Sequence, residues 1–384
     1  MRKRLRWGLI GGGLGSQIGE PHRIAARMDD LFTLTAGALD VNPAKGRAFA
    51  AELGIADDRA YGTWRDMFEG ERGRADRVDL VTIATPNVTH YEIARTFLEG
   101  GFDVLCEKPL TLDVSHAEDL VRIAAQHRRV CAVNFGFSGY PMVRQARAMV
   151  RAGDLGRIRV VVAEFAHGFH YDANDADNPR IRWRYDPKQA GGSAVLADAG
   201  IHALHMACYI LGQSIEALSA HFQSNVAGRQ LEDDALLAIR FSEGTVGRLW
   251  TSAVAIGQMH GLNIRVFGEK GGLRWNQEQP NQLVWTPAAQ YLRTLERGGE
   301  GLYPAATRGS RITVGHVEGM LEAFGNIYRD LHAVITTPRS RGSSVAFEHP
   351  PSAEAGLEMV RAVNAAVASA KNGSCWTVVR DSVK

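Results

Sequence analysis

Through the first 135 residues, short apolar runs alternate with longer stretches in which apolar residues recur at helical spacing. The apolar runs, which predict strands, cover residues 5–10, 32–39, 78–84, 103–106 and 130–134. The helical stretches cover residues 17–28, 44–53, 90–99 and 113–127. Strands that alternate with helices in this way form a parallel, doubly wound sheet with helices on both faces. We therefore expect residues 1–135 to form one α/β domain.

The pattern changes after about residue 156, where longer strand-like stretches are joined by short turns. These stretches cover residues 157–166, 216–223, 234–241, 245–255 and 262–267. Short turns between strands predict antiparallel pairing. Helices are expected at 200–211, 318–336 and 352–372, and residues 280–315 are expected to form a long functional loop. We predict a second, α+β domain over 136–384 with a large, mostly antiparallel open sheet, and leave open whether its C-terminal helix packs back on the first domain.

The composition excludes several classes of protein. Of 384 residues, 45% are hydrophobic and 22% are charged, which excludes a disordered chain. Lys and Arg (44) nearly balance Asp and Glu (42), so no basic surface predicts a nucleic-acid partner. No apolar run reaches the roughly 18 residues of a membrane span, and the start MRKRLR lacks a signal sequence's apolar segment, so we expect a cytoplasmic protein. The four scattered cysteines predict buried, reduced thiols.

A glycine turn, Gly11-Gly12-Gly13-Leu14-Gly15-Ser16, joins the first strand to the first helix. Such glycines let the backbone approach a pyrophosphate, which the N–H groups of the helix N-terminus then bind. The third glycine of the strict pattern falls on Ser16. Asp40 ends the second strand, where a carboxylate binds the ribose hydroxyls of NAD and repels the extra phosphate of NADP. We expect NAD to contact Gly11, Gly13, Leu14, Gly15 and Asp40.

Two alternatives to this interpretation stay open. The turn could bind no ligand, with Asp40 acting as a cap at the end of the strand. Lys45 and Arg47 lie close by in the sequence and could bind a 2′-phosphate, so NADP remains possible.

Three later segments carry polar residues that fit oxidoreductase chemistry. Thr85-Pro86-Asn87-Val88-Thr89-His90 and Glu107-Lys108-Pro109 each follow a predicted strand, at the sheet edge where ligands bind. Asp198 and His202 are four residues apart and share one face of a helix that a Gly191-Gly192 pair precedes. An imidazole can accept a hydroxyl proton near neutral pH, a carboxylate can orient it, and an ammonium can stabilise the developing alkoxide.

Together, the glycine turn, the TPNxxH segment, the EKP turn and the GG…DxGxH helix start make the sequence resemble the Gfo/Idh/MocA family. This family is named after glucose–fructose oxidoreductase and inositol dehydrogenase. The resemblance covers the whole chain and implies a Rossmann domain, NAD or NADP, and a sugar or cyclitol whose ring hydroxyl is oxidised. It implies that Lys108, Asp198 and His202 are catalytic. It also implies that Thr85, Asn87, His90, Glu107 and Lys108 line the cofactor.

Each catalytic candidate also has an ordinary structural explanation. His202 could be a buried core histidine, and Lys108 could be a solvated surface residue. His205 lies one turn after His202, so Asp198, His202 and His205 could form a metal-binding face. No further ligands occur at suitable spacing, so we expect no metal and regard His205 as a packing residue.

Substrate contacts are expected from the second domain, next to Lys108, Asp198 and His202. Trp183 and Arg184, in the segment Arg182-Trp183-Arg184, could stack on and anchor a sugar or the nicotinamide. Further candidates are Tyr140, Phe165, His167, His170 and His316. Many relatives have a basic or tyrosine-rich segment after the strand near Asn134. Residues 134–140 here contain no basic residue, which weakens the case for an acidic or phosphorylated substrate.

Three functions remain from the sequence. The first is an NAD(P)-dependent dehydrogenase of a sugar, sugar derivative or inositol. The second is an NAD-dependent glycosidase that oxidises its sugar transiently, for which the 280–315 loop would leave room for an aglycone. The third is a non-catalytic nucleotide-binding protein. Because one face of the antiparallel sheet is uncovered, we also expect a homodimer or homotetramer.

Overall fold

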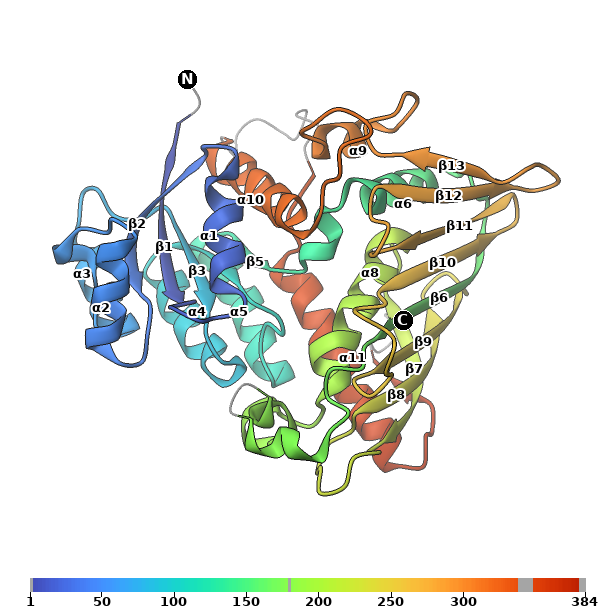
Figure 1. Cartoon of the computed structure of the whole chain (residues 1–384), viewed down its shortest axis with the longest axis horizontal. Coiled ribbons are helices and arrows are strands. Elements are labelled where there is room, and N and C mark those ends of the chain that lie inside the picture. The colour runs from blue at the N-terminus through green and yellow to red at the C-terminus, as the bar shows by residue number, and fades with distance from the viewer. Residues whose placement is uncertain (1–2, 179–180, 338–347, 380–384) are drawn as a thin grey trace. The chain divides into compact units, whose positions relative to one another are not determined.

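The computed structural model describes residues 3–178, 181–337 and 348–379. It divides into two compact units, shown in Figure 1. The first unit contains Met1–Gly139 and Met320–Leu357, and the second contains Tyr140–Gly319 and Glu358–Lys384. The first unit therefore differs from the expected 1–135 domain, because it also takes in a segment from near the C-terminus.

The first unit is built on a five-stranded parallel sheet in the order β2-β1-β3-β4-β5. Its strands are β1 (Leu5–Gly11), β2 (Phe32–Ala38), β3 (Leu80–Ala84), β4 (Asp103–Cys106) and β5 (Cys131–Val133). The chain reverses its direction of winding between β1 and β3. In open parallel sheets, ligands bind at the carboxyl ends of the strands at such a point. The predicted doubly wound sheet is confirmed.

Helices and short 3₁₀ turns connect these strands. They are α1 (Gly19–Met28), α2 (Pro43–Glu52), α3 (Trp64–Arg72), η2 (Asn87–Thr89), α4 (His90–Glu99), α5 (Val114–His127) and η3 (Gly136–Gly139). Helix α1 begins at Gly19, two residues later than expected, because the glycine turn is longer than the sequence pattern suggested. Helix α3 was not expected from the sequence.

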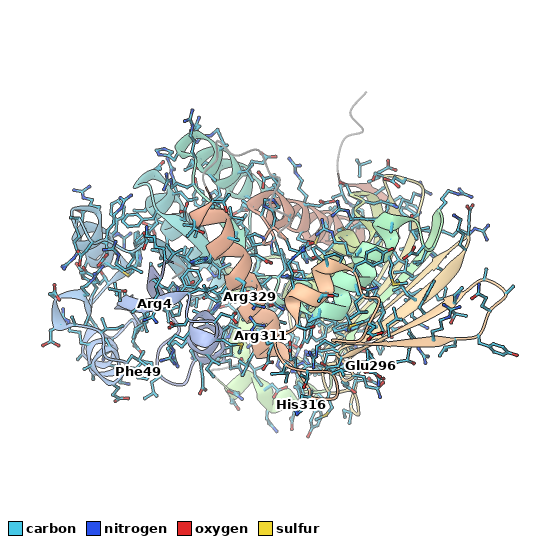
Figure 2. All side chains as sticks on the ribbon, turned by 90° about the horizontal axis from the view of Figure 1, so that it is seen from above. Arg4, Phe49, Glu296, Arg311, His316 and Arg329 are labelled. Atoms are coloured by element: carbon cyan, nitrogen blue, oxygen red, sulfur yellow. The ribbon has the colours of Figure 1, made fainter. Side chains whose placement is uncertain are left out.

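Helix α10 (Met320–Thr336) packs against α1 and completes the first unit. Phe324, Tyr328 and Leu331 join the buried cluster that Trp7 and Phe32 form in the sheet. At the helix surface, Arg329, labelled in Figure 2, forms a 3.2 Å ion pair with Asp29. The periodicity of α10 predicted a helix correctly but gave no indication of the sheet that it covers.

The second unit contains a nine-stranded sheet in the order β13-β12-β11-β10-β6-β9-β8-β7-β14. Strands β6 and β9 pair in parallel, and the other recorded neighbours are antiparallel, as the short turns predicted. The strands are β6 (Ile158–Ala166), β7 (Ile215–Gln223), β8 (Asp234–Phe241), β9 (Val246–Ser252), β10 (Asn263–Gly268), β11 (Gly271–Asn276), β12 (Gln282–Pro287), β13 (Arg293–Glu296) and β14 (Thr377–Val378).

One face of this sheet is covered by helices. Helices α6 and α8 contact each other and the strands β6, β10, β11 and β12. The helices assigned to the unit are α6 (Pro141–Ala152), η4 (Ala173–Asp177), η5 (Arg182–Tyr185), α7 (Pro187–Ala190), the π-helix Leu196–Gly200, α8 (Ile201–Leu211) and α9 (Pro304–Gly309). Helix α11 (Ala353–Lys371) begins in the first unit and continues into the second.

The interpretation of residues 280–315 as a loop is wrong, because β12, β13 and α9 lie within them. The irregular part is anchored by Arg297, which is 2% exposed. Its guanidinium donates to the carbonyls of Ile312 (2.8 Å), Thr313 (3.1 Å) and His316 (2.5 Å) and pairs with Glu318 (3.0 Å). Figure 2 labels His316 on this segment. A buried arginine thus supplies the hydrogen bonds that a regular element would otherwise provide.

The cysteine prediction holds in part. All four thiols are free, and Cys106 and Cys131 are buried, but Cys208 is half-buried and Cys375 is exposed. None of the helices in the described residues combines the length and the apolar character that a membrane span requires.

Candidate active site

The glycine turn is squeezed between the ends of two neighbouring strands. A Cβ on Gly11 would lie 2.4 Å from the carbonyl oxygen of Ala84, and one on Gly13 would lie 2.4 Å from that of Leu39. Neither position tolerates a side chain. Gly15, with φ +80°, differs, because apart from its two neighbours in the chain no heavy atom of the described residues would lie within 4 Å of its Cβ. The turn therefore has a packed side and an open side, as a dinucleotide cradle requires.

Gly19 serves the packing function that the sequence pattern assigned to the third glycine. Its Cβ would lie 2.0 Å from the carbonyl oxygen of Gly12, so α1 can begin there only with a glycine. Ser16 occupies the strict third position and instead accepts the backbone N–H of Gly19 through its hydroxyl (3.2 Å). The spacing Gly15-Ser16-Gln17-Ile18-Gly19 could have suggested this role, since it extends the motif by three residues.

Asp40 follows β2 and lies beside the glycine turn. Its Oδ1 accepts the backbone N–H of Asn42 (2.8 Å), and its Oδ2 lies 3.7 Å from the position of a Cβ on Gly13. Lys45 and Arg47 are exposed on the first turns of α2. One carboxylate oxygen therefore caps the local turn, as the structural alternative required, while the other faces the cradle.

His90 begins α4 and is 1% exposed. Its Nδ1 lies 2.8 Å from the carbonyl oxygen of Pro109, and its Nε2 lies 2.9 Å from that of Thr85. Burial lowers the pKa of His90, against the raising effect of these two oxygens. His90 therefore braces two turns against each other. Of the TPNxxH segment, the half-buried Thr85 and Asn87 are more accessible to a ligand.

Lys108 is half-buried and precedes Pro109 through a cis peptide bond, directly after β4. Glu107, the residue before it, is 7% exposed. Burial alone would raise the pKa of Glu107, but hydrogen bonds from His22 and Asn134 bring it below its usual value. Both carboxylate oxygens bind protein donors, so Glu107 supports the turn that carries Lys108.

Asp198 and His202 lie where a π-helix changes into an α-helix. Asp198 is in the π-helix Leu196–Gly200, and His202 is in the first turn of α8. Single π-turns within helices are frequent at functional sites. Glu232 caps the start of this segment, accepting the Ser193 hydroxyl (2.6 Å) and the backbone N–H of Ala194 (3.0 Å). Sequence analysis missed Glu232, since it lies more than 30 residues away in the chain.

Asp198 also forms an ion pair that the sequence did not predict. The Nε of Arg184 donates to Asp198 Oδ2 at 2.7 Å. The guanidinium of Arg184 also lies 4.6 Å from the centre of the Trp183 ring. Arg184, which the sequence offered as a substrate anchor, thus neutralises the carboxylate of the catalytic candidate.

A cluster of aromatic rings and imidazoles in the second unit reaches His202 through Phe165. We call it the ring cluster, and it contains Phe165, His167, Phe169, His170, His202 and His260. The centre of the Phe165 ring lies 6.0 Å from those of both His202 and His260. His167 extends the cluster, lying 5.2 Å from Phe169 and from His170. His260 and Phe169 were not expected from the sequence, because no motif marks them.

Two of these imidazoles are neutral near physiological pH. Burial, as the leading cause, lowers the pKa of both His167 and His170 to about 4. The Nδ1 of His167 accepts the backbone N–H of Phe169 (3.3 Å), which leaves the ring proton on Nε2. His170 Nδ1 is 3.1 Å from the hydroxyl of Tyr185. The ring cluster therefore offers uncharged hydrogen-bonding groups beside apolar faces.

Two expected substrate residues lie outside this cluster. Tyr140 is 3% exposed and packs against Trp275, with ring centres 5.2 Å apart. The sequence marked it by its position after the predicted first domain, but the ring is part of the core. His316 is exposed and contacts Thr313 (3.2 Å) on the segment that Arg297 anchors.

His205 is a buried packing residue of α8, with its ring 5.9 Å from that of Tyr209. Within residues 3–178, 181–337 and 348–379, no group of three His, Cys, Asp or Glu side chains is placed to hold a metal ion. Burial, and secondarily the charge of Arg147, lower the pKa of His205 to about 3.

This pKa predicts a contribution to acid sensitivity. The unfolded chain takes up a proton at His205 near pH 6.5, whereas the folded chain does so only near pH 3, so stability falls as the pH drops below 6.5. At pH 5 the loss is about 2 kcal/mol. Urea unfolding measures the free energy of unfolding at pH 7.5 and pH 5. The decrease between the two pH values should be about 2 kcal/mol smaller in His205→Gln than in the wild type. Equal losses would contradict the prediction, since His167 and His170 titrate in both proteins.

Comparison with known families matches both units. Residues 5–135 match the model described as "Oxidoreductase family, NAD-binding Rossmann fold", and residues 143–274 match the "GFO/IDH/MocA C-terminal domain". The matched ranges contain the glycine turn, Asp40, Lys108, Asp198 and His202, whereas Tyr140 and His316 lie outside them.

Individual relatives extend along nearly the whole chain. The uncharacterized oxidoreductase YfiI of Bacillus subtilis is 37% identical over 97% of this chain and 96% of its own length. A crystal structure of an inositol dehydrogenase homolog from Azotobacter vinelandii, complexed with NAD+, is 42% identical, with a TM-score of 0.94 over 98% of this chain and 97% of that one. A second structure from that organism, complexed with NADH and myo-inositol, is 41% identical, with a TM-score of 0.91 and 98% of both chains covered.

Proposed function

Because the chain belongs to the Gfo/Idh/MocA family of oxidoreductases, we propose that it oxidises a secondary ring hydroxyl of a sugar, sugar derivative or inositol with NAD as the hydride acceptor. The observation that carries the proposal is the junction of the π-helix and α8, where Asp198 pairs with Arg184 and the His202 ring lies 6.0 Å from the Phe165 ring. The first unit supplies an NAD-binding Rossmann fold.

The glycine turn fits the cofactor. Its side at Gly15 is open, and the absence of side chains at Gly11 and Gly13 lets the backbone pack closely against the neighbouring strand ends. The N-terminus of α1 and the free face of Asp40 would hold the pyrophosphate and the adenosine ribose. When bound, NAD supplies the hydride acceptor of the reaction.

The chain's own residues would handle the proton and the charge. His202 accepts the proton of the substrate hydroxyl, and the Lys108 ammonium stabilises the negative charge that develops on the oxygen. Asp198 stabilises the imidazolium that forms, while its pair with Arg184 limits its rotation.

The chemistry of the ring cluster favours a neutral substrate. His167 and His170 carry no charge at neutral pH, and Arg184 is already paired with Asp198. A phosphate or carboxylate would meet uncharged imidazoles at His167 and His170, whereas hydroxyls can form hydrogen bonds with their nitrogens. The apolar faces of Phe165 and Phe169 suit the C–H face of a sugar or cyclitol ring. We therefore favour neutral cyclitols and sugars, such as the myo-inositol of the Azotobacter complex, over phosphorylated ones.

A substrate screen tests this proposal. The purified protein is incubated with NAD or NADP and a panel of cyclitols, neutral sugars, uronic acids and sugar phosphates, and NAD(P)H formation is followed by absorbance. Turnover confined to neutral polyols with NAD supports the proposal. Faster turnover of the anionic compounds would overturn the substrate class, and cofactor binding without any turnover would favour the non-catalytic alternative.

The sequence argument for the glycosidase alternative is weakened, because β12, β13 and α9 lie within the expected 280–315 loop. The same panel decides the question when glycosides are added. Release of free sugar without net NADH formation would identify a glycosidase, whereas NADH formation without release identifies a dehydrogenase.

Asp40 is expected to set the preference for NAD. Asp40→Asn keeps the size of the side chain but removes the charge that repels the 2′-phosphate. The kcat/KM for NADP should therefore rise relative to that for NAD. Loss of a charged hydrogen bond to the ribose should lower kcat/KM for NAD by about 10- to 100-fold. Kinetics with both cofactors measure this change. An unchanged NAD/NADP ratio would mean that Asp40 acts only as the cap of the Asn42 turn.

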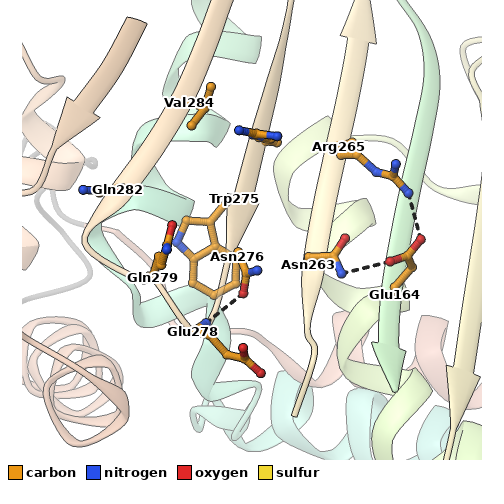
Figure 3. A pocket seen from close by; sticks show the side chains of 10 residues that line it. Glu164, Asn263, Arg265, Trp275, Asn276, Glu278, Gln279, Gln282 and Val284 are labelled. Atoms are coloured by element: carbon orange, nitrogen blue, oxygen red, sulfur yellow. Dashed lines mark hydrogen bonds and ion pairs between the residues drawn. The ribbon is translucent and has the colours of Figure 1, made fainter. Parts of the chain in front are cut away.

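The open face of the second sheet supports association between copies of the chain. Leu236, Val246 and Phe267 are exposed on this face. Beside them, a groove of about 670 Å³ is lined by polar side chains, among them the Glu164–Arg265 pair shown in Figure 3. Exposed apolar side chains next to satisfied polar pairs are typical of subunit interfaces. We propose a homodimer or homotetramer formed through this face, and the mass from light scattering decides between these states and a monomer.

A further inference from the structure

Glu107 is a buried acid next to Lys108, and the proposed reaction assigns no step to it. Its Oε1 accepts the Nε2–H of His22 (2.9 Å) and an amide N–H of Asn134 (2.5 Å), and its Oε2 accepts the backbone N–H of Lys108 (3.1 Å). His22 is fully buried and Asn134 is 2% exposed. Three hydrogen-bond donors hold this buried carboxylate rigidly. Rotation that breaks any one of the hydrogen bonds would leave negative charge uncompensated in the protein interior, which costs free energy. Its third donor is the backbone of the proposed catalytic lysine.

The hydrogen bonds continue from His22 into the core of the first unit. Its Nδ1 lies 2.9 Å from the hydroxyl of Tyr328, which lies 3.0 Å from the hydroxyl of Thr82. The indole N–H of Trp7 donates to Thr82 at 2.9 Å. These residues, with Glu107, come from β1, α1, β3, α10 and the turn after β4, and all of them are buried.

The two ends of this hydrogen-bond network have a fixed direction. The Trp7 indole can only donate, so Thr82 accepts from it, and the contact between Thr82 and Tyr328 can run in either direction. The ionised carboxylate of Glu107 can only accept, so His22 donates its Nε2–H to it, while the other ring nitrogen of His22 contacts Tyr328. The network therefore presents one imidazole donor to the carboxylate next to Lys108.

His22 also links Glu107 to the cofactor turn. It lies on α1, one turn after Gly19, whose backbone abuts Gly12. The next residue, Arg23, donates its guanidinium to the carbonyl of Gly12 and lies over the Phe49 ring. One rigid helix thus contacts the glycine turn at its first residues and Glu107 through His22.

We propose that His22 is a positioning residue that acts through Glu107 to hold Lys108 in register with the dinucleotide cradle. The inference rests on the catalytic role proposed for Lys108. It assigns a function to a histidine that lies in no recognisable motif, and it explains why Glu107 points into the core instead of toward a ligand.

Two substitutions separate positioning from mere packing. His22→Gln keeps an N–H donor near the place of Nε2 and should retain kcat within about 3-fold. His22→Leu fills the space but removes the donor, and should lower kcat about 10- to 30-fold while KM and the Kd for NAD change less than about 3-fold. The matched control is His332→Leu, which removes a buried histidine of α10 that bonds to the carbonyl of Lys3 and should leave kcat unchanged.

A second readout does not depend on turnover. Competitive acetylation with acetic anhydride, read by mass spectrometry, compares the reactivity of the Lys108 amine with that of the exposed Lys45 and Lys270. The acetylation rate of Lys108 relative to the two reference lysines should change several-fold in His22→Leu and remain close to wild type in His22→Gln. The rates of the two reference lysines should not change in either variant.

The outcomes distinguish this inference from the proposed function. Normal kcat and normal Lys108 labelling in a folded His22→Leu protein would overturn the positioning role. Equal loss in the Gln and Leu variants would do so too, because the donor would then be irrelevant. If the wild type oxidises nothing in the screen, the proposed function fails, and the labelling still decides whether His22 controls Lys108.

Discussion

Replacing Lys108 by methionine is expected to lower kcat by about 10²- to 10³-fold while the protein still binds NAD. Methionine preserves the length and apolar stem of the side chain but removes the ammonium that stabilises the developing alkoxide. A single donor aimed at such a charge typically contributes a factor of this size. Because the interaction strengthens as the charge forms, kcat should fall more than KM rises. Steady-state kinetics with the best substrate of the screen, and fluorescence titration with NADH, measure the two quantities.

Lys270→Met serves as the control, since Lys270 is exposed in the β10–β11 turn of the second unit. This variant should match the wild type in both measurements. A Lys108→Met enzyme that keeps normal kcat would remove Lys108 from the mechanism. One that loses NAD binding as well would indicate that Lys108 holds the cofactor and has no separate role in the chemical step.

Replacing His202 by asparagine is expected to lower kcat/KM by about 10²- to 10⁴-fold, the usual contribution of a general base. The pH profile should change with it. In the wild type, the oxidation rate should fall on the acid side as His202 becomes protonated, and this limb should disappear in the variant. His167 and His170, whose pKa burial lowers to about 4, are present in both proteins, so the difference between the two profiles reports on His202.

His221→Asn is the matched control, because His221 is exposed on β7 and has no place in the ring cluster. Its profile should overlay that of the wild type. An acid limb that persists unchanged in His202→Asn would show that another group accepts the proton. Asp198 would then be the first residue to test, together with Arg184, the cation that pairs with it.

Much of the first unit could be predicted because its signals are local. Each strand of the Rossmann sheet is a short apolar run, and the glycine turn has to follow β1 for steric reasons that hold in any context. Helix α10 shows the limit of such reasoning. Its periodicity predicts a helix but not a partner, since any apolar face of suitable width could cover the sheet of the first unit.

The site divides in the same way. Gly11, Gly13 and Asp40 could be singled out from the sequence because backbone sterics and strand ends leave few choices, and their contacts with NAD stay a prediction. Glu232 and His22 were not predicted, because each acts on a segment far away in the chain. Tyr140 was assigned to the substrate from its position alone, and the structure places its ring against Trp275 in the core. A residue type at the right position says nothing about the direction in which packing turns its side chain.

The sequence by itself determined the α/β character of the first unit, the antiparallel character of the second and the position of the glycine turn after β1. These features follow from hydrophobic period, turn chemistry and the space around a glycine, all of which act over a few neighbouring residues. Only the tertiary structure decided that Asp198 pairs with Arg184, that buried histidines stay neutral, and that Glu107 faces His22. Burial and hydrogen-bond partners depend on which distant segments meet, and these contacts set the charge and orientation of the groups that do chemistry.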